Sequence, residues 1–395
     1  MLELIVATEN KTKKIALVEN GKLVEYYDDT NQENRNEGNI YIGAVKDVLK
    51  GMQSAFVDIG TEKNSFIHLK DVLPKVDEKE EIWDKEKDIK DVLKVNEKLL
   101  VQVKKDSNDK KGARVSTHIN LPSKYIVLMP ETNIITISKK IKSDTEKERL
   151  LKIVKNNLPQ NMGAIVRTSA DKSPEADLIE DIKQINDKWN TIKKKYNSGN
   201  IKCPSIIYKS PDITEKIMID TFSKGLSTIV TNNKIEYEKI LKIKNEDANY
   251  KDINVILKQN ENILNKYDIK KQVAKLQDRR IWLNCGGFIT IDKTEALTAI
   301  DVNTGKYTGK KNLEDTIFKV NEEATIEIAK QVRLRDIGGI IIIDYIDMLN
   351  NKHKEKIQNL LIDMLKSDRA KTQVEGFTKL DLMEFTRKHI CSHKS

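Results

Sequence analysis

The sequence predicts a multidomain protein of the α/β class, and three observations lead to this fold class. The chain has 395 residues, too many for one compact core and typical of two to four domains of roughly 100 to 200 residues each. Its first third contains short β-runs separated by turns. Its last third alternates strand-like and helix-like segments, and a mixed region joins the two.

The N-terminal segment predicts a strand hairpin. Leu2, Leu4 and Val6 alternate on one face, and a second strand follows at residues 14–19. From residue 38 to about residue 120, short β-runs alternate with turns rich in Gly, Asn and Lys. These runs read NIYIGAVKDVL, SAFVDIG, NSFIHLKDVL and KLLVQVKKD. Their rhythm is typical of a five-stranded OB-type barrel.

The middle of the chain predicts two further features. The charged stretch at residues 76–98 interrupts the β-runs, and its charges require solvent, so we expect a surface loop or a short helix there. Beyond residue 125, the runs YIVLMP, NIITIS and MGAIVRT are mixed with helical stretches at 144–156 and 176–196, which predicts an α+β module. A helix-rich stretch follows Pro211.

The last third predicts the order strand, helix, strand, helix. GGFITID and ALTAIDVNTG form a strand pair, and Asn312 is expected to cap a long helix with an apolar residue at every third or fourth position. A turn at Gly338 and Gly339 leads into the apolar strand IIIIDYI, and a helix at residues 352–365 follows. This order places the ends of two strands side by side.

The composition indicates a basic protein. It is 38% hydrophobic and 33% charged, and 70 Lys and Arg residues exceed 61 Asp and Glu residues, which gives a net charge of +9. A basic surface attracts phosphate groups, so the excess suggests a polyanionic partner, although a general bias toward lysine explains it equally well. The three cysteines have no metal-like spacing, and no run approaches the roughly 18 apolar residues of a membrane span. We therefore expect reduced thiols and a cytoplasmic protein.

An aspartate interrupts each of two apolar runs in the last third. Asp301 and Asn303 are two residues apart on a strand, so their side chains point to the same face. Asp344 ends a run of four isoleucines. A carboxylate buried in such a setting needs an ion pair, hydrogen bonds or a metal ion.

Two interpretations of these aspartates are open. In the first, each caps a turn or pairs with a nearby cation such as Lys306, Arg333 or Arg335. In the second, they bind Mg²⁺, which prefers oxygen ligands and leaves positions for water and a substrate phosphate. Two carboxylates at adjacent strand ends favour the metal. The chemistry expected of such a metal site is phosphodiester hydrolysis, in which the amide of Asn303 could orient a carboxylate or the attacking water. Asp347 is expected outside the set of ligands.

Five stretches of the chain resemble the bacterial ribonuclease E/G family of endoribonucleases, and within it the ribonuclease G branch. The most specific are IDKTEALTAIDVNTGKYTGKKNLEDTIFKVNEEA and RLRDIGGIIIIDYIDM, which match the family's catalytic signature. NMGAIVRTSADKSPEADL, NIYIGAVKDVLKGMQSAFVDIG and KGARVSTHINLPSKYIVLMP match the family as well. The resemblance covers nearly the whole chain.

The resemblance implies a specific architecture. An RNase H-like subdomain is expected at residues 1–35 and 212–277, with an OB-fold RNA-binding domain at 36–120 and a 5′-sensor α+β module at 121–211 inserted into it. A DNase I-like catalytic domain is expected at 278–388, followed by a tail at 389–395.

The resemblance also implies an activity. The family cleaves single-stranded RNA endonucleolytically in rRNA processing and mRNA turnover and leaves 5′-monophosphate ends. The matching positions imply Mg²⁺ held by Asp301 and Asp344 and assisted by Asn303. A non-catalytic RNA-binding protein and a DNA nuclease are the rival interpretations. The intact carboxylates favour an enzyme, and the RNA-handling modules favour RNA over DNA.

The matching positions imply two RNA contacts outside the metal site. Phe56 and Phe66 are expected to stack unpaired bases and Lys111 to contact phosphate, although both aromatic residues also fit a barrel core. Arg167 and Thr168, with Val127 and Ser123 as a wall, match the family's pocket for a 5′-phosphate. On pattern alone, an Arg-Thr pair at a strand end is more often exposed polar surface. The family's further arginine is Lys371 here, which keeps the charge but loses the fork of donors, so 5′-end sensing is expected to be weaker or absent.

The C-terminal segment departs from the family's pattern. The family joins two chains through a shared zinc ion and a pair of cysteines, whereas this chain ends RKHICSHKS. His389, Cys391 and His393 are potential ligands, but such a short terminal cluster is more often a frayed tail. The zinc link and the family's C-terminal oligomerisation domain are therefore expected to be absent. A homodimer through the catalytic domains stays possible.

Overall fold

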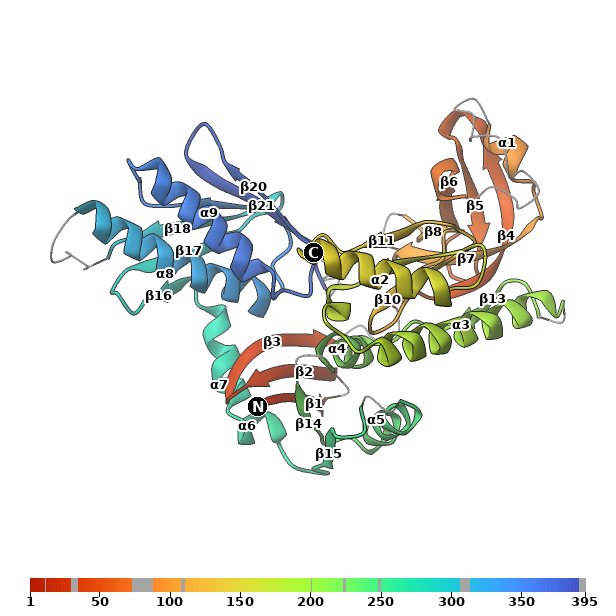
Figure 1. Ribbon diagram of the computed structural model, residues 1–395, viewed down its shortest axis with the longest axis horizontal. Helices are drawn as coiled ribbons and strands as arrows, with labels where there is room; N and C mark the ends of the chain where they lie inside the picture. Colours follow the sequence, from red (N-terminus) through yellow and green to blue (C-terminus); the bar gives the residue numbers. More distant parts are fainter. Residues whose placement is uncertain are drawn as a thin grey trace. The chain divides into compact units, whose positions relative to one another are not determined.

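The computed structural model describes residues 1–10, 12–29, 35–72, 88–107, 111–199, 201–222, 225–247, 250–305 and 313–390. The chain divides into two compact units, residues 1–30 with 221–395 and residues 31–220. Each unit contains two β-sheets with flanking helices (Figure 1), which confirms the predicted multidomain α/β class. Among the described residues, no helix is both long and apolar enough to cross a membrane.

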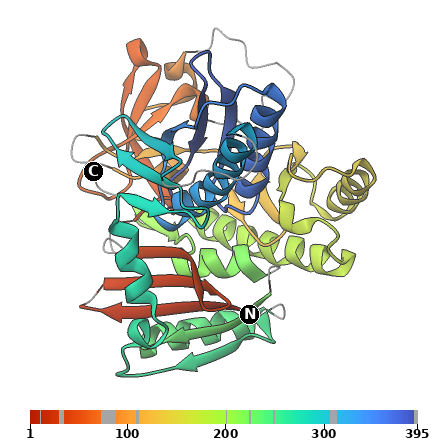
Figure 2. The same ribbon diagram turned by 90° about the vertical axis from the view of Figure 1, so that its left-hand side faces the viewer.

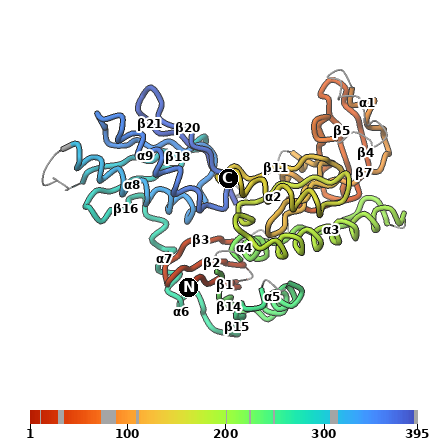
Figure 3. The backbone as a smooth tube through the Cα atoms, viewed as in Figure 1, coloured from red at the N-terminus to blue at the C-terminus, as the bar shows by residue number. Residues whose placement is uncertain are grey.

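The first sheet of the first unit combines the N-terminus with a segment from the middle of the chain. Its order is β15-β14-β1-β2-β3, with the bounds β1 (Leu2–Glu9), β2 (Thr12–Glu19), β3 (Lys22–Asp29), β14 (Leu226–Thr231) and β15 (Asn254–Leu257). β1 and β2 form the predicted antiparallel hairpin, and β1 pairs in parallel with β14. Figure 3 traces the red and green segments side by side.

β1 is the central strand of this sheet. Leu4 and Val6 are buried as predicted, but Ile5 and Ala7 are buried too, so the expectation of one apolar face was incomplete. Ile5 and Ala7 pack against α6 (Ile263–Lys266) and α7 (Ile269–Ala274), which cover that face (Figure 2). α5 (Lys234–Glu246) contacts β14 and β15.

A closed barrel forms one part of the second unit. Its strands are β4 (Ile40–Leu49), β5 (Ser54–Asp58), β6 (Ser65–His68), β7 (Lys98–Lys105) and β8 (Arg114–Ser116). They pair in the order β4-β5-β6-β8-β7, and β7 pairs back to β4, which closes five strands into the barrel that was predicted. β13 (Ser205–Tyr208) pairs with the part of β4 that β5 leaves open. Within the charged stretch, α1 (Ile89–Val92) is helical, and residues 76–87 lie outside the described residues.

The α+β module of the second unit also follows the prediction. Its sheet has the order β11-β12-β10-β9, with the bounds β9 (Leu121–Pro122), β10 (Ile126–Pro130), β11 (Ile135–Ile137) and β12 (Met162–Val166). The predicted helices are α2 (Asp144–Asn157) and α3 (Glu175–Asn197). α4 (Ile213–Thr221) follows the module in sequence.

The C-terminal sheet of the first unit has six strands in the order β16-β17-β18-β19-β21-β20. Their bounds are β16 (Arg280–Trp282), β17 (Phe288–Lys293), β18 (Leu297–Asn303), β19 (Gly339–Asp344), β20 (Thr372–Phe377) and β21 (Leu382–Arg387). β17 and β18 form the predicted pair, and the predicted helices are α8 (Leu313–Leu334) and α9 (Asn351–Leu365). Asn350 caps α9, whereas the predicted cap Asn312 lies outside the described residues.

The two faces of the C-terminal sheet differ. α8 and α9 pack together over one face (Figure 1), and the side chains beneath them form one buried core. Ile300 and Val302 of β18 and Ile341 and Ile343 of β19 belong to this core. Because side chains alternate along a strand, the residues between them point to the other face, where they are mostly exposed.

A buried ion network holds the end of this sheet. The side chain of Arg387 is fully buried, and its Nε and Nη1 atoms pair with Asp368 and Asp336 at 2.8 Å each. Nη1 also donates to the carbonyl oxygen of Ile337, just before β19. A buried charge of this kind is tolerated because each partner is satisfied.

Replacement of Arg387 by Met is expected to destabilise the first unit by about 3 to 5 kcal/mol, because two buried carboxylates lose their partner. The measurement is the midpoint of urea unfolding. Lys366→Met is the control, since Lys366 pairs with Asp363 on the exposed surface of α9's C-terminal end. Equal midpoints for the two variants would contradict the role of the buried network.

Candidate functional site

The two strand-end carboxylates lie next to each other on the face of the C-terminal sheet opposite α8 and α9. We call it the open face, because its side chains on β18 and β19 are mostly exposed. Asp301 on β18 and Asp344 on β19 are direct register partners in a parallel strand pair. Asn303 follows two residues after Asp301 on the same face, and its Nδ2 atom donates a 2.6 Å hydrogen bond to Asp301 Oδ2. The fold therefore brings together the three side chains that the sequence singled out.

The premise that these aspartates are buried was wrong. Both Asp301 and Asp344 are exposed at the ends of their strands, on the face opposite α8 and α9. Two of the cations named as alternative partners bond elsewhere: Arg333 donates to Ser367, and Arg335 donates to Gln331 and to a main-chain carbonyl. Lys306 lies outside the described residues. The carboxylates are thus accessible to a cation from solvent.

Electrostatics at this edge favours a cation. Partial burial, together with the negative charges of Asp301 and Asp347, raises the pKa of Asp344 above its ordinary value. A divalent cation relieves this repulsion directly. Among the described residues, no three His, Cys, Asp or Glu side chains gather as a metal site. Two carboxylates beside an amide nevertheless suit Mg²⁺, which usually takes one or two carboxylates and keeps water at its other positions.

The aromatic pair of the barrel is not part of its core. Phe56 on β5 and Phe66 on β6 are register partners, with ring centroids 6.3 Å apart at an angle of 69°. Both are half-buried, whereas Ala55, Val57 and Ile67 beside them are fully buried in the barrel. The rings therefore face outward, as a base-stacking role requires.

Two cations lie on or just before β8 (Arg114–Ser116), the strand that pairs with β6. Lys111 is exposed, three residues before Arg114 on β8. Arg114 is the register partner of Phe66, and its guanidinium pairs with Asp71 at 2.8 Å. Arg114 was missed because β8 is only three residues long and gives no periodic signal.

Two of the predicted 5′-phosphate residues of the α+β module, Arg167 and Val127, lie at the loop between β9 and β10. Arg167 follows β12, and its Nη1 atom donates a 2.6 Å hydrogen bond to the carbonyl oxygen of Ser123. Val127 is half-buried on β10, and exposed Thr168 shares a 2.9 Å hydrogen bond with Ser138. Lys371 is exposed just before β20 in the other unit, and its part in this pocket stays a prediction.

Two aspartates missed by the sequence reasoning organise this module. Asp181 is fully buried on α3 and accepts hydrogen bonds from Ser123 Oγ and from the backbone N–H of Tyr125, which fixes the β9–β10 loop. Burial raises the pKa of Asp181, and these hydrogen bonds oppose that rise. Asp220 pairs with the Nη2 atom of Arg167. Neither residue lies near its partner in sequence, so no local pattern reveals them.

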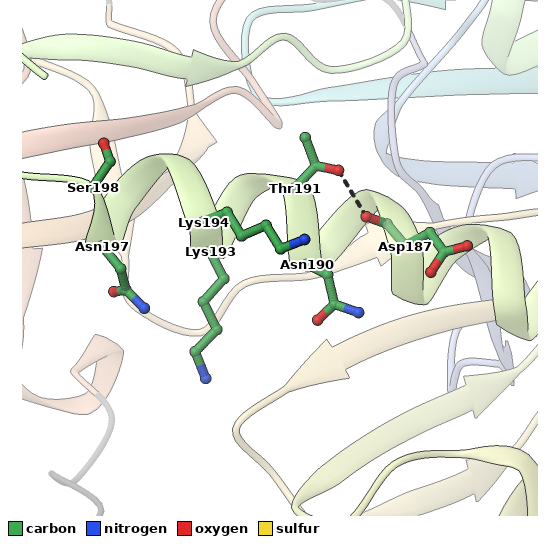
Figure 4. A pocket seen from close by; sticks show the side chains of 7 residues that line it. All are labelled: Asp187, Asn190, Thr191, Lys193, Lys194, Asn197 and Ser198. Atoms are coloured by element: carbon green, nitrogen blue, oxygen red, sulfur yellow. Dashed lines mark hydrogen bonds between the residues drawn. The ribbon is translucent and has the colours of Figure 1, made fainter. Parts of the chain in front are cut away.

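The predicted C-terminal ligands and a hollow along α3 do not form a recognisable active site among the described residues. His389 Nδ1 is 2.8 Å from the carbonyl oxygen of Asp336, and Cys391 and His393 lie outside the described residues. A shallow hollow along α3 contains only polar and charged side chains (Figure 4). These are Asp187, Asn190, Thr191, Lys193, Lys194, Asn197 and Ser198.

Known proteins resemble this chain over most of its length. The sequence model of the Ribonuclease E/G family matches residues 120–390. Ribonuclease G of Haemophilus influenzae is 38% identical over 389 residues, which cover 98% of this chain and 79% of that protein. Ribonuclease G of Escherichia coli K12 is 36% identical over 392 residues, with the same coverage. Ribonuclease E of Nostoc is 33% identical over 356 residues, 89% of this chain and 51% of that protein. The chain belongs to the ribonuclease E/G family.

Proposed function

We propose that this protein is a Mg²⁺-dependent endoribonuclease that cleaves single-stranded RNA and leaves 5′-monophosphate ends. The observation that carries the proposal is the register pair of Asp301 and Asp344 on an open sheet face, with Asn303 bonded to Asp301. Membership of a ribonuclease family supports RNA as the substrate. The names of the relatives give RNA as the class of substrate. We propose rRNA precursors and mRNA because they are the substrates of the family.

The three residues near the ends of β18 and β19 have different roles in this proposal. Asp301 and Asp344 would hold Mg²⁺, which supplies an activated water and neutralises charge on the scissile phosphate when it is bound. Asn303 Nδ2 holds one oxygen of Asp301, so it fixes the orientation of that carboxylate and leaves the other oxygen free to face the ion. The packed core behind β18 and β19 keeps both strands in register.

The remaining parts of the proposal concern the whole chain. We assign residues 1–35 and 212–277 to an RNase H-like subdomain, 36–120 to the OB-fold domain, 121–211 to the 5′-sensor module and 278–388 to a DNase I-like catalytic domain. The strand pairing of β1, β2 and β3 with β14 and β15 supports the split subdomain. We further propose a cytoplasmic enzyme that acts as a homodimer.

Asp301→Asn and Asp344→Asn are expected to lower kcat at least about 100-fold, because each removes a charged ligand without changing its shape. The measurement is cleavage of a fluorescent A/U-rich single-stranded RNA with Mg²⁺ or with EDTA. Asp292→Asn is the matched control, since Asp292 lies on the same sheet face but pairs with Arg279. Binding of RNA in EDTA is expected to survive in all three variants. Binding without cleavage by the unmodified chain would instead indicate a non-catalytic RNA-binding protein.

Phe56→Ala and Phe66→Ala are each expected to weaken RNA binding by about 1 to 3 kcal/mol, the usual contribution of one base stacked on an aromatic ring. The measurement is the Kd for a single-stranded RNA in EDTA. Met52→Ala is the control, because Met52 is 60% exposed at the turn between β4 and β5 of the same barrel. An unchanged Kd in both Phe variants would remove the barrel from the RNA path.

Arg167→Lys is expected to reduce the preference for 5′-monophosphorylated over 5′-hydroxylated RNA by roughly 10-fold, because lysine lacks the fork of donors. The measurement is the ratio of kcat/KM for the two substrates. Asp220→Ala is expected to increase the preference, since it removes the carboxylate that pairs with the Nη2 atom of Arg167. Arg149→Lys serves as control, because Arg149 pairs with Glu146 within α2. A ratio near one in the unmodified protein would show that the pocket does not sense 5′ ends.

A further inference from the structure

An exposed aromatic cluster lies on the open face of the C-terminal sheet, outside the residues assigned so far. Trp282 on β16 is 59% exposed, and its ring contacts Phe288 on β17 with centroids 5.3 Å apart at 60°. The guanidinium of Arg280 lies over the Phe288 ring, 4.5 Å from its centroid. Large aromatic side chains are usually well buried, so an exposed indole in edge-to-face contact with a phenyl ring suggests a ligand.

The strand register connects this cluster to the two carboxylates. One row across the sheet pairs Arg280 with Thr290, Thr290 with Asp301, and Asp301 with Asp344. The neighbouring row pairs Trp282 with Phe288 and Phe288 with Asn303. These residues therefore project from the same face of the sheet.

The spacing suits one nucleotide beside the cleaved bond. Adjacent strands lie about 4.8 Å apart and successive residues about 3.4 Å apart, so Trp282 on β16 and Asp301 on β18, offset by two residues, are separated by roughly 12 Å at the backbone. The sugar and base attached to a phosphate at the carboxylates can span this distance. Trp282 offers an apolar ring for the face of a base, and Arg280 offers a cation for the sugar-phosphate chain.

We propose that Trp282 and Phe288, with Arg280 beside them, form a stacking site for a nucleobase next to the scissile phosphate. The inference rests on the proposed function, because it takes Asp301 and Asp344 as the place where the phosphate is held. The occupant is an unpaired base of single-stranded RNA, since a base within a duplex has no free face to offer. Trp282 thus positions the substrate rather than taking part in the chemistry.

The test compares Trp282→Ala with Trp282→Phe on the full chain. We expect Trp282→Ala to raise KM for an A/U-rich single-stranded RNA about 10-fold or more with kcat little changed, because stacking contributes binding in both ground and transition states. Trp282→Phe retains a ring and is expected to stay within about 3-fold of the unmodified protein. Ile235→Ala is the control, because Ile235 is 77% exposed on α5.

A scan of abasic RNA locates the stacked base. The RNA carries one abasic position, moved step by step along the strand on both sides of the cleavage point. The unmodified protein should lose affinity at one position adjacent to that point, and Trp282→Ala should lose nothing further there, because the two changes remove the same contact. The scan is read as Kd in EDTA, so it reports on stacking even if the chain proves unable to cleave.

The possible outcomes separate the inference from the proposed function. If Trp282→Ala lowers the affinity equally for every abasic RNA, or if its KM and Kd are unchanged, the stacking site is overturned. The carboxylate site is not affected by either result. A Trp282→Ala chain that changes its elution in gel filtration without a change in RNA affinity would also overturn it and would identify a surface between copies of the chain. A position-specific loss in binding by a protein that does not cleave supports base stacking by Trp282 but rejects the enzyme, and with it the placement of this base next to a scissile phosphate.

Discussion

The buried guanidinium of Arg387 is the interaction on which the C-terminal sheet depends. Arg387 ends β21, and it bonds Asp336 and Ile337 just before β19 and Asp368 just before β20. The ends of three strands, β19, β20 and β21, are therefore connected by one side chain. Because β19 begins at this network and ends at Asp344, the register of the network determines where that carboxylate lies beside Asp301.

The same sheet places its packed core on one face and the candidate site on the other. The core beneath α8 and α9 contains the alternate residues of β18 and β19, which holds these strands without any contribution from the polar residues. Asp301 and Asp344 can then remain exposed and still be fixed in position. A solvent-accessible carboxylate pair keeps a cation exchangeable and leaves room for water and a phosphate, which a buried pair would exclude.

Much of this arrangement could be predicted from local pattern. The alternation of β18, the apolar run of β19 and the helical period between them place the two carboxylates side by side, and the structure agrees. Contacts between distant segments could not be predicted. Asp220 meets Arg167 from another element, and three-residue β8 brings Arg114 to Phe66 with no periodicity of its own. The burial of the two aspartates was also misjudged, because an apolar run does not show that one face of its strand is exposed to solvent.

On the proposed function, selectivity for single-stranded RNA would follow from the aromatic residues more than from the carboxylates of the C-terminal sheet. Phosphates are equally present in single and double strands, so a site made of Asp301, Asp344 and a cation does not distinguish them. As proposed stacking sites, Phe56 and Phe66 on the barrel and Trp282 on the C-terminal sheet would each need the free face of a base, which stacking within a duplex hides. An RNA that makes both the phosphate contacts and the stacking contacts would therefore be unpaired. Pairing would cost it the stacking energy while leaving its phosphates unchanged.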